Sequence, residues 1–277
     1  MDPIGTQRVS VEVCDHIAAV RLTRPEKHNA LDRAMFHAIS EAIDEVAEDP
    51  GVRAVVLSGE GPSFCSGLDF PSFLAEGRPM DEMFVRRDGE DANLAQRVSV
   101  GWLNLPVPVV AAIHGACIGG GAQIALGCDF RMVAPDARMS IREAHWGLIP
   151  DMGITRTLPR LCRIDVAKEL VLTARMLDGA EAVRVALATR VSEDPLAAAH
   201  LLAEEIATRS PDAVRRGKAL LERSWTADAA ESLALEEELQ RELLGSENQM
   251  RAVVAGMGGE PPEFDDSTWT GSSHRSM

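Results

Sequence analysis

Two short apolar runs, residues 52–57 and 109–113, constrain the fold of this chain more than any other feature of its sequence. Apart from Arg53, both runs consist of Val, Ala, Leu and Ile, without alternation of polar and apolar residues. A strand with one face in water alternates, whereas a strand covered on both faces reads as a continuous apolar run. The two runs therefore predict strands that are buried on both faces, in the interior of a sheet.

The rest of the first 194 residues alternates strand and helix patterns. Residues 8–13 and 17–22 predict a hairpin with Asp15 and His16 at its turn. Asp32 predicts the N-cap of a helix whose apolar residues recur at helical spacing. The other elements predicted here are a short helix at 122–126, strands at 130–133 and 138–141, and a mobile, locally helical segment at 71–93.

The pattern changes at Pro195, after which no strand is predicted. Amphipathic helices are predicted at 198–207, 212–223 and 229–244. Residues 258–277 are rich in Gly, Pro, Ser and acidic residues, which predicts disorder. We therefore expect an α/β core at 1–194, a helical region at 195–257 and a disordered tail at 258–277.

Composition narrows the classes of partner. The chain has 277 residues, 45% of them hydrophobic, and a net charge of −15, which argues against nucleic acid or an anionic membrane as the main partner. The longest apolar stretch, 107–128, is interrupted by His114 and five glycines and does not read as a membrane span. Five cysteines without metal or redox spacing, and a start without signal-peptide character, predict a cytoplasmic protein with buried free thiols.

Glycine-containing turns follow the two buried strands, at 64–69 and 114–121. Glycines at the start of a helix expose backbone N–H groups, which suit an anion or a developing oxyanion. The alternative is that the run 119–121 only permits close packing. No nucleotide-binding loop motif, serine-hydrolase elbow or metal-ligand cluster is present in the sequence.

Four segments, taken in order, resemble the crotonase family, also called the enoyl-CoA hydratase/isomerase family. They are 24–31 (RPEKHNAL), 64–69 (FCSGLD), 119–123 (GGGAQ) and 143–153 (EAHWGLIPDMG). No one of these motifs is specific, but their order and spacing together are. The resemblance implies an α/β fold, a crotonase-type spiral of ββα units with a C-terminal helical region. It also implies that residues 195–257 assemble the chain into a homotrimer or a dimer of trimers.

The resemblance further implies a substrate and residue roles. The substrate would be an acyl-CoA thioester, with coenzyme A as part of the substrate and no separate cofactor or metal. The N–H groups of Leu68 and Gly120 would form an oxyanion hole for a thioester enolate. The residues expected to contact coenzyme A are Arg24, Lys27, Ala30, Ser66, Leu68 and Asp69.

Glu143 is the first candidate for proton transfer. Its apolar neighbours Ala144, Trp146 and Leu148 would desolvate the carboxyl and raise its pKa toward neutrality. The alternative is an exposed Glu paired with Arg138 or Arg142.

Gln123 and Asp151 complete the expected catalytic set. The hydratases of this family use two glutamates, and Gln123 stands at the position of the first, where an amide cannot accept a proton from water. Asp151 matches an aspartate of the family's dienoyl-CoA isomerases, although it could instead cap a helix or pair with Arg156. Double-bond isomerisation is therefore favoured over hydration on one glutamate, while a non-catalytic acyl-CoA binding protein is a third possibility.

Overall fold

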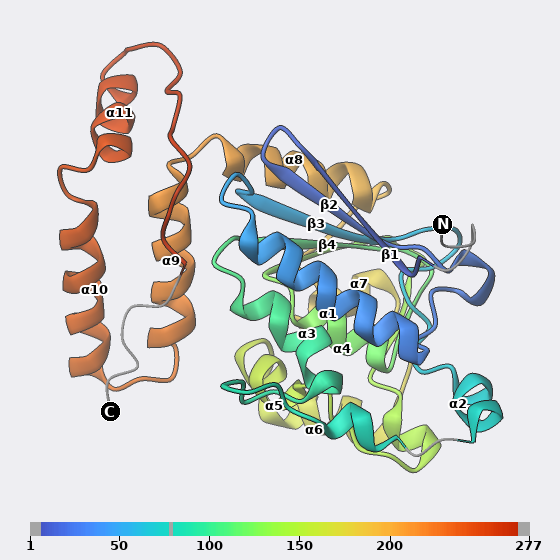
Figure 1. Cartoon of the computed structure of the whole chain (residues 1–277). Helices are drawn as coiled ribbons and strands as arrows, with labels where there is room; N and C mark the ends of the chain where they lie inside the picture. Colours follow the sequence, from blue (N-terminus) through green and yellow to red (C-terminus); the bar gives the residue numbers. More distant parts are fainter. Residues whose placement is uncertain (1–6, 78–79, 271–277) are drawn as a thin grey trace.

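A six-stranded sheet forms the centre of the computed structural model, which describes residues 7–77 and 80–270 (Figure 1). Its strand order is β1-β2-β3-β4-β6-β8. The first two strands are antiparallel, and the other neighbours are parallel. The strands are β1 (Val9–Cys14), β2 (Ile17–Leu22), β3 (Ala54–Gly59), β4 (Val109–Ile113), β6 (Phe130–Val133) and β8 (Arg190–Val191). A separate parallel pair consists of β5 (Ala116–Ile118) and β7 (Arg138–Ser140).

The predicted hairpin and the two buried strands are confirmed. Asp15 and His16 form the turn of the hairpin with φ values of 48° and 67°, in the left-handed region that tight two-residue turns use. Every residue of β4 is buried, as are the first five residues of β3. Both strands lie inside the sheet, so helices cover them on both faces.

Helices α1 (Arg33–Glu48) and α3 (Leu94–Asn104) cover one face of the sheet (Figure 1). Asp32 caps α1 as predicted, because its carboxylate accepts a hydrogen bond from the N–H of Met35 at 2.8 Å. Helix α3 was not predicted, although Asn93 and Gln96 form a capping box at its start.

Helix α8 (Pro195–Ala207) covers the other face of the sheet (Figure 1). Ala199 and Ala203 are fully buried and pack with Val56, Val110 and Met132 of the strands. Alanines at this spacing bring the helix close to the sheet. The expected boundary at residue 195 therefore falls within the α/β unit, because α8 covers one face of its sheet.

Short helices and turns connect these layers. The predicted helix at 122–126 is confirmed, and the segment 71–93 contains α2 and η2, with residues 78–79 outside the described residues. The connecting elements are η1 (Pro25–Lys27), α2 (Phe70–Glu76), η2 (Asp81–Phe84), α4 (Gly120–Leu126), η3 (Glu143–Trp146), α5 (Ile154–Thr157), η4 (Leu158–Arg160), α6 (Ile164–Thr173) and α7 (Gly179–Arg184).

Three more helices stand beside the core, at the left of Figure 1: α9 (Pro211–Ser224), α10 (Ala229–Leu243) and α11 (Glu247–Gly256). Two buried cations of α9 attach them to the core. The guanidinium of Arg215 donates to the carbonyls of Val52 at 3.1 Å and Trp269 at 2.9 Å, and the Lys218 ammonium lies 2.7 Å from the Asp129 carboxylate. Both contacts join residues far apart in the sequence.

Part of the predicted disordered tail is ordered, so that prediction is wrong for residues 258–270. This segment returns along α9 (Figure 1), where Asn248 forms two hydrogen bonds with the backbone of Asp265. Ser267 is 2% exposed and donates to the Asp212 carboxylate at 2.6 Å. Polar contacts with α9 and α11 hold the segment, and composition alone did not reveal them. Residues 271–277 lie outside the described residues.

The three C-terminal helices leave large apolar side chains in contact with solvent, including Trp225, Leu233, Val254 and Met257. Such side chains suit a surface that a second chain covers. The homotrimer or dimer of trimers stays a prediction.

Candidate active site

The two glycine-containing segments meet behind one cavity. Cys65 and Cys117 form an isolated parallel bridge, in which the N–H of Cys65 donates to the carbonyl of Ala116 at 2.9 Å and that of Ile118 to the carbonyl of Cys65 at 3.0 Å. These backbone bonds set the segment after β3 beside the segment that enters α4.

Two glycines make this approach possible. A Cβ added at Gly121 would lie 2.4 Å from the carbonyl oxygen of Cys65. One added at Gly67, where φ is +91°, would lie 2.7 Å from the carbonyl oxygen of Ile118 and 3.7 Å from the amide nitrogen of Gly120. Any larger residue at either position would push the segments apart. Close packing and the exposure of N–H groups are therefore two effects of the same glycines.

The backbone N–H groups of Leu68 and Gly120 are both free to donate. No acceptor within residues 7–77 and 80–270 takes a hydrogen bond from either of them, and both residues line the cavity. The neighbouring N–H groups are occupied: that of Asp69 donates to Leu31 and that of Gly119 to Ser140. The site thus offers two backbone donors from two different segments.

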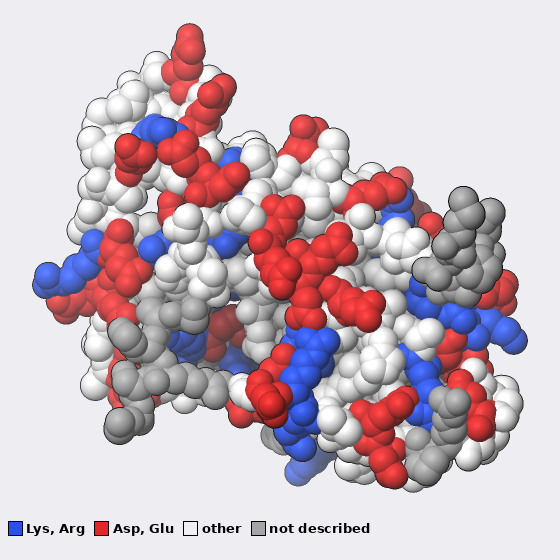
Figure 2. Space-filling view, in the orientation of Figure 1, with Lys and Arg blue, Asp and Glu red and all other residues white. Residues whose placement is uncertain are grey.

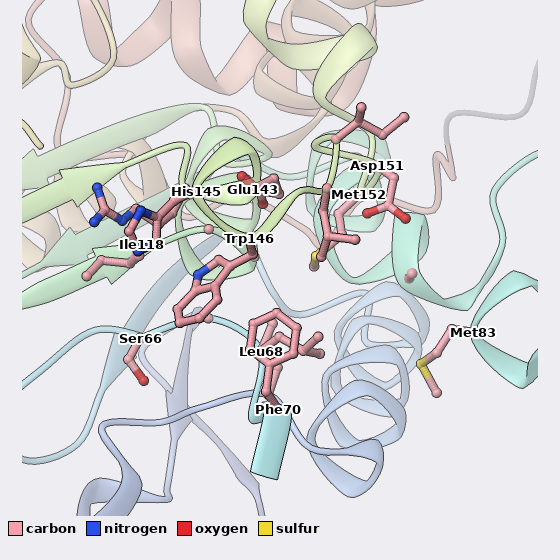
Figure 3. Close-up of a pocket in the computed structure, with 18 of the residues that line it drawn as sticks. Ser66, Leu68, Phe70, Met83, Ile118, Glu143, His145, Trp146, Asp151 and Met152 are labelled. Atoms are coloured by element: carbon pink, nitrogen blue, oxygen red, sulfur yellow. The ribbon is translucent and has the colours of Figure 1, made fainter. Parts of the chain in front are cut away.

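The cavity has a volume of about 590 Å³ and a largely apolar wall (Figure 3). In Figure 3, Glu143, Asp151 and Met152 lie along one side, and Leu68 and Phe70 lie opposite them. Its apolar lining comprises Leu31, Phe36, Leu68, Phe70, Met80, Met83, Phe84, Ala95, Ile118, Trp146, Leu148, Ile149, Met152 and Met176. The charged or titratable side chains that line it are Arg138, Arg142, Glu143, His145 and Asp151.

Glu143 begins η3 and is 8% exposed. Its Oε1 accepts a hydrogen bond from Nε2 of Gln123 at 2.6 Å, and its buried Oε2 accepts none from the part of the chain that the structure describes. The alternative pairing is not formed, since Glu143 makes no salt bridge with a described residue and the Arg142 guanidinium donates instead to the carbonyl of Ala174 at 2.7 Å. One carboxylate oxygen is therefore held and the other is available.

Burial raises the pKa of Glu143 above its ordinary value, and the charge of Asp151 adds to the rise. The backbone N–H of Glu143 and the amide of Gln123 oppose this effect, because hydrogen bonds donated to the carboxylate favour its charged form. The net rise moves the carboxyl toward the range in which it can both accept and return a proton near neutral pH.

Asp151 lies at the exposed side of the cavity. Partial desolvation by the surrounding wall raises its pKa above the ordinary value. Neither structural alternative holds: the N-cap of α5 is Gly153, and Asp151 forms no salt bridge with Arg156 among the described residues. The structure thus brings Glu143, Asp151 and Gln123 to one cavity.

The expected coenzyme A contacts divide into two groups. Lys27 is exposed, and Ser66 lines the cavity with its hydroxyl 3.3 Å from the carbonyl of Lys27. Arg24 and Asp69 are buried and paired with each other at 2.8 Å, and Ala30 is buried, with its carbonyl accepting from Arg24 at 3.0 Å. The side chains of Arg24 and Asp69 therefore point into the protein rather than toward a bound phosphate.

Three residues of the cavity wall were not predicted to belong to the site. The rings of Phe70 and Trp146 are tilted at 44° with centroids 5.1 Å apart, and His145 lies edge-on to Trp146. Trp146 is 58% exposed. In a chain with only 4% aromatic residues, Phe70 directly after the segment 64–69 and Trp146 within the segment 143–153 were a usable signal.

This fold and this site define a family. The family model described as "Enoyl-CoA hydratase/isomerase" matches residues 12–266, and the chain belongs to that family. It is an enzyme of the family with the crotonase fold. The resemblance stated from four motifs is confirmed.

Two curated relatives catalyse different reactions. The chain is 33% identical over 257 residues to the mouse (Mus musculus) mitochondrial Delta(3,5)-Delta(2,4)-dienoyl-CoA isomerase, covering 87% of this chain and 76% of that protein. It is 32% identical over 255 residues to the mouse mitochondrial methylglutaconyl-CoA hydratase, covering 90% and 79%. Relatives at equal distance thus include an isomerase and a hydratase.

Solved structures support the fold over nearly the whole chain. A putative enoyl-CoA hydratase/isomerase from Mycobacterium abscessus has a TM-score of 0.84 at 30% identity, covering 94% of this chain and all of that one. A putative enoyl-CoA hydratase from Streptomyces coelicolor A3(2) has a TM-score of 0.85 at 29% identity, covering 96% of each chain. Among residues 7–77 and 80–270, no helix is both long and apolar enough to span a membrane.

Proposed function

We propose that this protein is an isomerase that moves a carbon–carbon double bond along the acyl chain of an enoyl- or dienoyl-CoA thioester. One observation carries the proposal: the carboxylate of Glu143 faces an amide, Gln123, where a hydratase needs a second carboxylate. An amide can donate to and accept from water but cannot remove its proton. An isomerase needs no such group, because no water is added.

The reaction begins at the free oxygen of the buried glutamate. Oε2 of Glu143 removes a proton from the acyl chain, and the electron pair moves onto the thioester oxygen to form a dienolate. The N–H groups of Leu68 and Gly120 donate to that oxygen, and each stabilises the transition state by about 3 kcal/mol. The protonated Glu143 then returns the proton to a different carbon, and the double bond has moved.

A longer transfer needs a second group. Asp151 lines the same cavity, and its raised pKa suits it to exchange a proton with a distant carbon of the chain. With Glu143 at one end of a conjugated diene and Asp151 near the other, one carboxylate removes a proton at its end and the other, protonated, carboxyl gives one at the opposite end. Proton exchange of both carboxyls with solvent then restores the starting state. This arrangement supports a dienoyl-CoA substrate as well as a simple enoyl-CoA.

The wall beyond Asp151 favours an uncharged acyl chain. Met83 and Asp151 lie toward one side of Figure 3, away from Ser66 and Ile118. If coenzyme A enters near Ser66 and Lys27, the acyl chain extends toward Met83, past a carboxylate that repels a second acid group. We therefore propose an apolar unsaturated chain rather than a chain ending in a carboxylate.

Product analysis tests the proposal. The purified protein is incubated in deuterated water with 2-enoyl-, 3-enoyl- and 3,5-dienoyl-CoA thioesters of one chain length, and the products are followed by NMR. We expect shifted double bonds, with deuterium at the α- or γ-carbon of the enoyl products and at the α- or ε-carbon of the dienoyl products. Rapid formation of a 3-hydroxyacyl product from the 2-enoyl thioester would establish hydration instead. The absence of both a product and deuterium exchange would indicate a non-catalytic binding protein.

A further inference from the structure

Both ends of the Gln123 side chain are hydrogen-bonded inside the protein. Nε2 donates to Oε1 of Glu143 at 2.6 Å, and Oε1 accepts from the backbone N–H of Met152 at 2.9 Å. The side chain is 1% exposed. One amide therefore connects two segments of the site, one carrying Glu143 and one carrying Asp151 beside Met152.

The backbone of Gln123 is fixed as well. Its N–H donates to the carbonyl of Gly119 at 3.0 Å, and its carbonyl accepts from the hydroxyl of Ser99 in α3 at 2.6 Å. Helix α4 is buried along its whole length. Gln123 thus starts from a rigid support and reaches outward to the two segments.

These contacts fix the orientation of the Gln123 side-chain amide. The backbone N–H of Met152 can only donate, so the oxygen of Gln123 must face it, and the NH2 group must face Glu143. Oε1 of Glu143 is consequently an acceptor whether or not the carboxyl is protonated. A proton on Glu143 then has one place, Oε2, the oxygen that receives no hydrogen bond from a described residue.

We propose that Gln123 is a positioning residue that directs the proton carried by Glu143 onto Oε2 and holds the Glu143 and Asp151 segments at a fixed separation. The inference rests on the proposed function in that Glu143 is the proton-transfer group. It does not depend on whether the proton moves along the chain or exchanges only at the α-carbon.

The same hydrogen bond acts on the titration of Glu143. It favours the charged carboxylate and so opposes the rise in pKa that burial and Asp151 produce. The other charged or titratable groups around Glu143 are Arg138, Arg142 and His145, which line the cavity, while Glu169 of α6 is paired with Arg175. Removing the Gln123 donor leaves these groups in place, so the pKa of Glu143 rises.

The test replaces the amide without emptying its space. Gln123→Met keeps a similar volume but has no hydrogen-bond donor for Glu143. Gln123→Asn keeps an amide that is too short by one methylene to span both contacts. The matched control is Ile124→Val, a buried residue of the same helix that does not line the cavity. For each variant we measure the pH profile of α-proton exchange into deuterated water, KM, and the unfolding temperature.

We expect both Gln123 variants to lose about 10²-fold in exchange rate, the effect of a misplaced reacting group, with KM nearly unchanged. The midpoint of the rising limb should move to higher pH, since a higher pKa requires a higher pH to form the base. Carbon-13 NMR of labelled glutamate, with Glu143→Gln for assignment, should show the same upward shift without turnover.

Ile124→Val should lower the unfolding temperature and leave the pH midpoint where it is. If the Gln123 variants lose activity in proportion to stability, with the Glu143 titration unmoved, Gln123 is a packing residue and the inference is wrong. A wild-type protein that only hydrates would refute the isomerase proposal and leave this comparison intact.

Discussion

The guanidinium of Arg24 lies 2.8 Å from the carboxylate of Asp69, and both side chains are buried behind the cavity. Asp69 also caps α2, accepting from the N–H of Ser72 at 3.1 Å. The pair thus links the loop before α1 to the start of the helix that follows Leu68. It orients the segment that presents one of the two free N–H groups.

Breaking this pair should lower the free energy of unfolding, because both side chains point into the protein rather than toward coenzyme A. Arg24→Met leaves the Asp69 carboxylate buried without its partner, and we expect a loss of about 3–5 kcal/mol in the free energy of unfolding. Urea unfolding measures it. The double variant Arg24→Met with Asp69→Leu should recover part of the loss, and a single variant as stable as wild type would contradict the structural role.

Lys27 should bind coenzyme A through its charge, against a net charge of −15 and the acidic side chains spread over the face in Figure 2. Lys27→Glu should weaken a CoA thioester more than a pantetheine thioester that lacks the 3′-phosphate. Lys168→Glu, an exposed residue of α6, makes the same change in net charge and is the control. Equal weakening of both ligands in calorimetry would remove Lys27 from the coenzyme A site.

Glu143→Gln should lower kcat by about 10² to 10⁴, the range for loss of a general acid–base group. The amide keeps the size of the side chain, so KM should change little. In the wild type the rising limb of the pH profile should lie above the ordinary range of a carboxyl, because burial raises the pKa of Glu143. Glu204→Gln on the surface of α8 is the control, and equal rates for the two variants would exclude Glu143 as the base.

Asp151→Asn should impair dienoyl-CoA isomerisation more than 3-enoyl-CoA isomerisation, because only the longer transfer uses a second carboxyl. It should also move the rising limb to lower pH. The negative charge of Asp151 raises the pKa of Glu143, so neutralising Asp151 lets Glu143 lose its proton at a lower pH. Kinetics on both substrates across pH measure the two effects, and an unchanged activity ratio would leave Asp151 outside the reaction.

The C-terminal segment should contribute to stability. Ending the chain at Gly259 removes the acceptors of Arg53 at Phe264 and of Arg215 at Trp269, each at 2.9 Å. Buried donors that lose their partners cost about 1–3 kcal/mol each, so the unfolding temperature should fall by several degrees. Asn248→Ala removes the two contacts to Asp265 and one to the Asp212 carboxylate but leaves the acceptors of Arg53 and Arg215 in place, so it should show a smaller loss. An unchanged unfolding temperature in calorimetry would contradict a stabilising role of this segment and favour the predicted disorder.

Local chemistry in the sequence predicted most of the fold. Asp32 predicts the start of α1, and the uninterrupted aliphatic runs predict β3 and β4, because capping and strand burial depend on residues close together in the sequence. The terminal segment was misread for the opposite reason. Its order comes from hydrogen bonds to Arg53, Arg215 and Asn248, which lie outside the segment in the sequence. The segment's own residues therefore show no apolar pattern that would indicate order.

The candidate site divides in the same way. Glycine and glutamate positions were readable from the motifs, since backbone exposure and proton transfer need those residue types. The inward direction of Arg24 was not readable, because an arginine in a loop looks the same whether it meets a phosphate or a buried aspartate. Nor could sequence show that Gln123 uses both ends of its amide.

Cys65 and Cys117, whose backbones form the bridge between the two glycine-containing segments, are fully buried and directly precede Ser66 and Ile118, which line the proposed thioester site. Thioesters transfer their acyl group to thiolates, so such neighbours would ordinarily threaten an enzyme with acylation by its own substrate. Burial raises the pKa of Cys65 to about 12 and that of Cys117 well above its ordinary value. Only the thiolate is nucleophilic. Burial thus disfavours the nucleophilic thiolate at both cysteines, which keeps these two sulfur atoms from competing for the acyl group of the proposed thioester substrate.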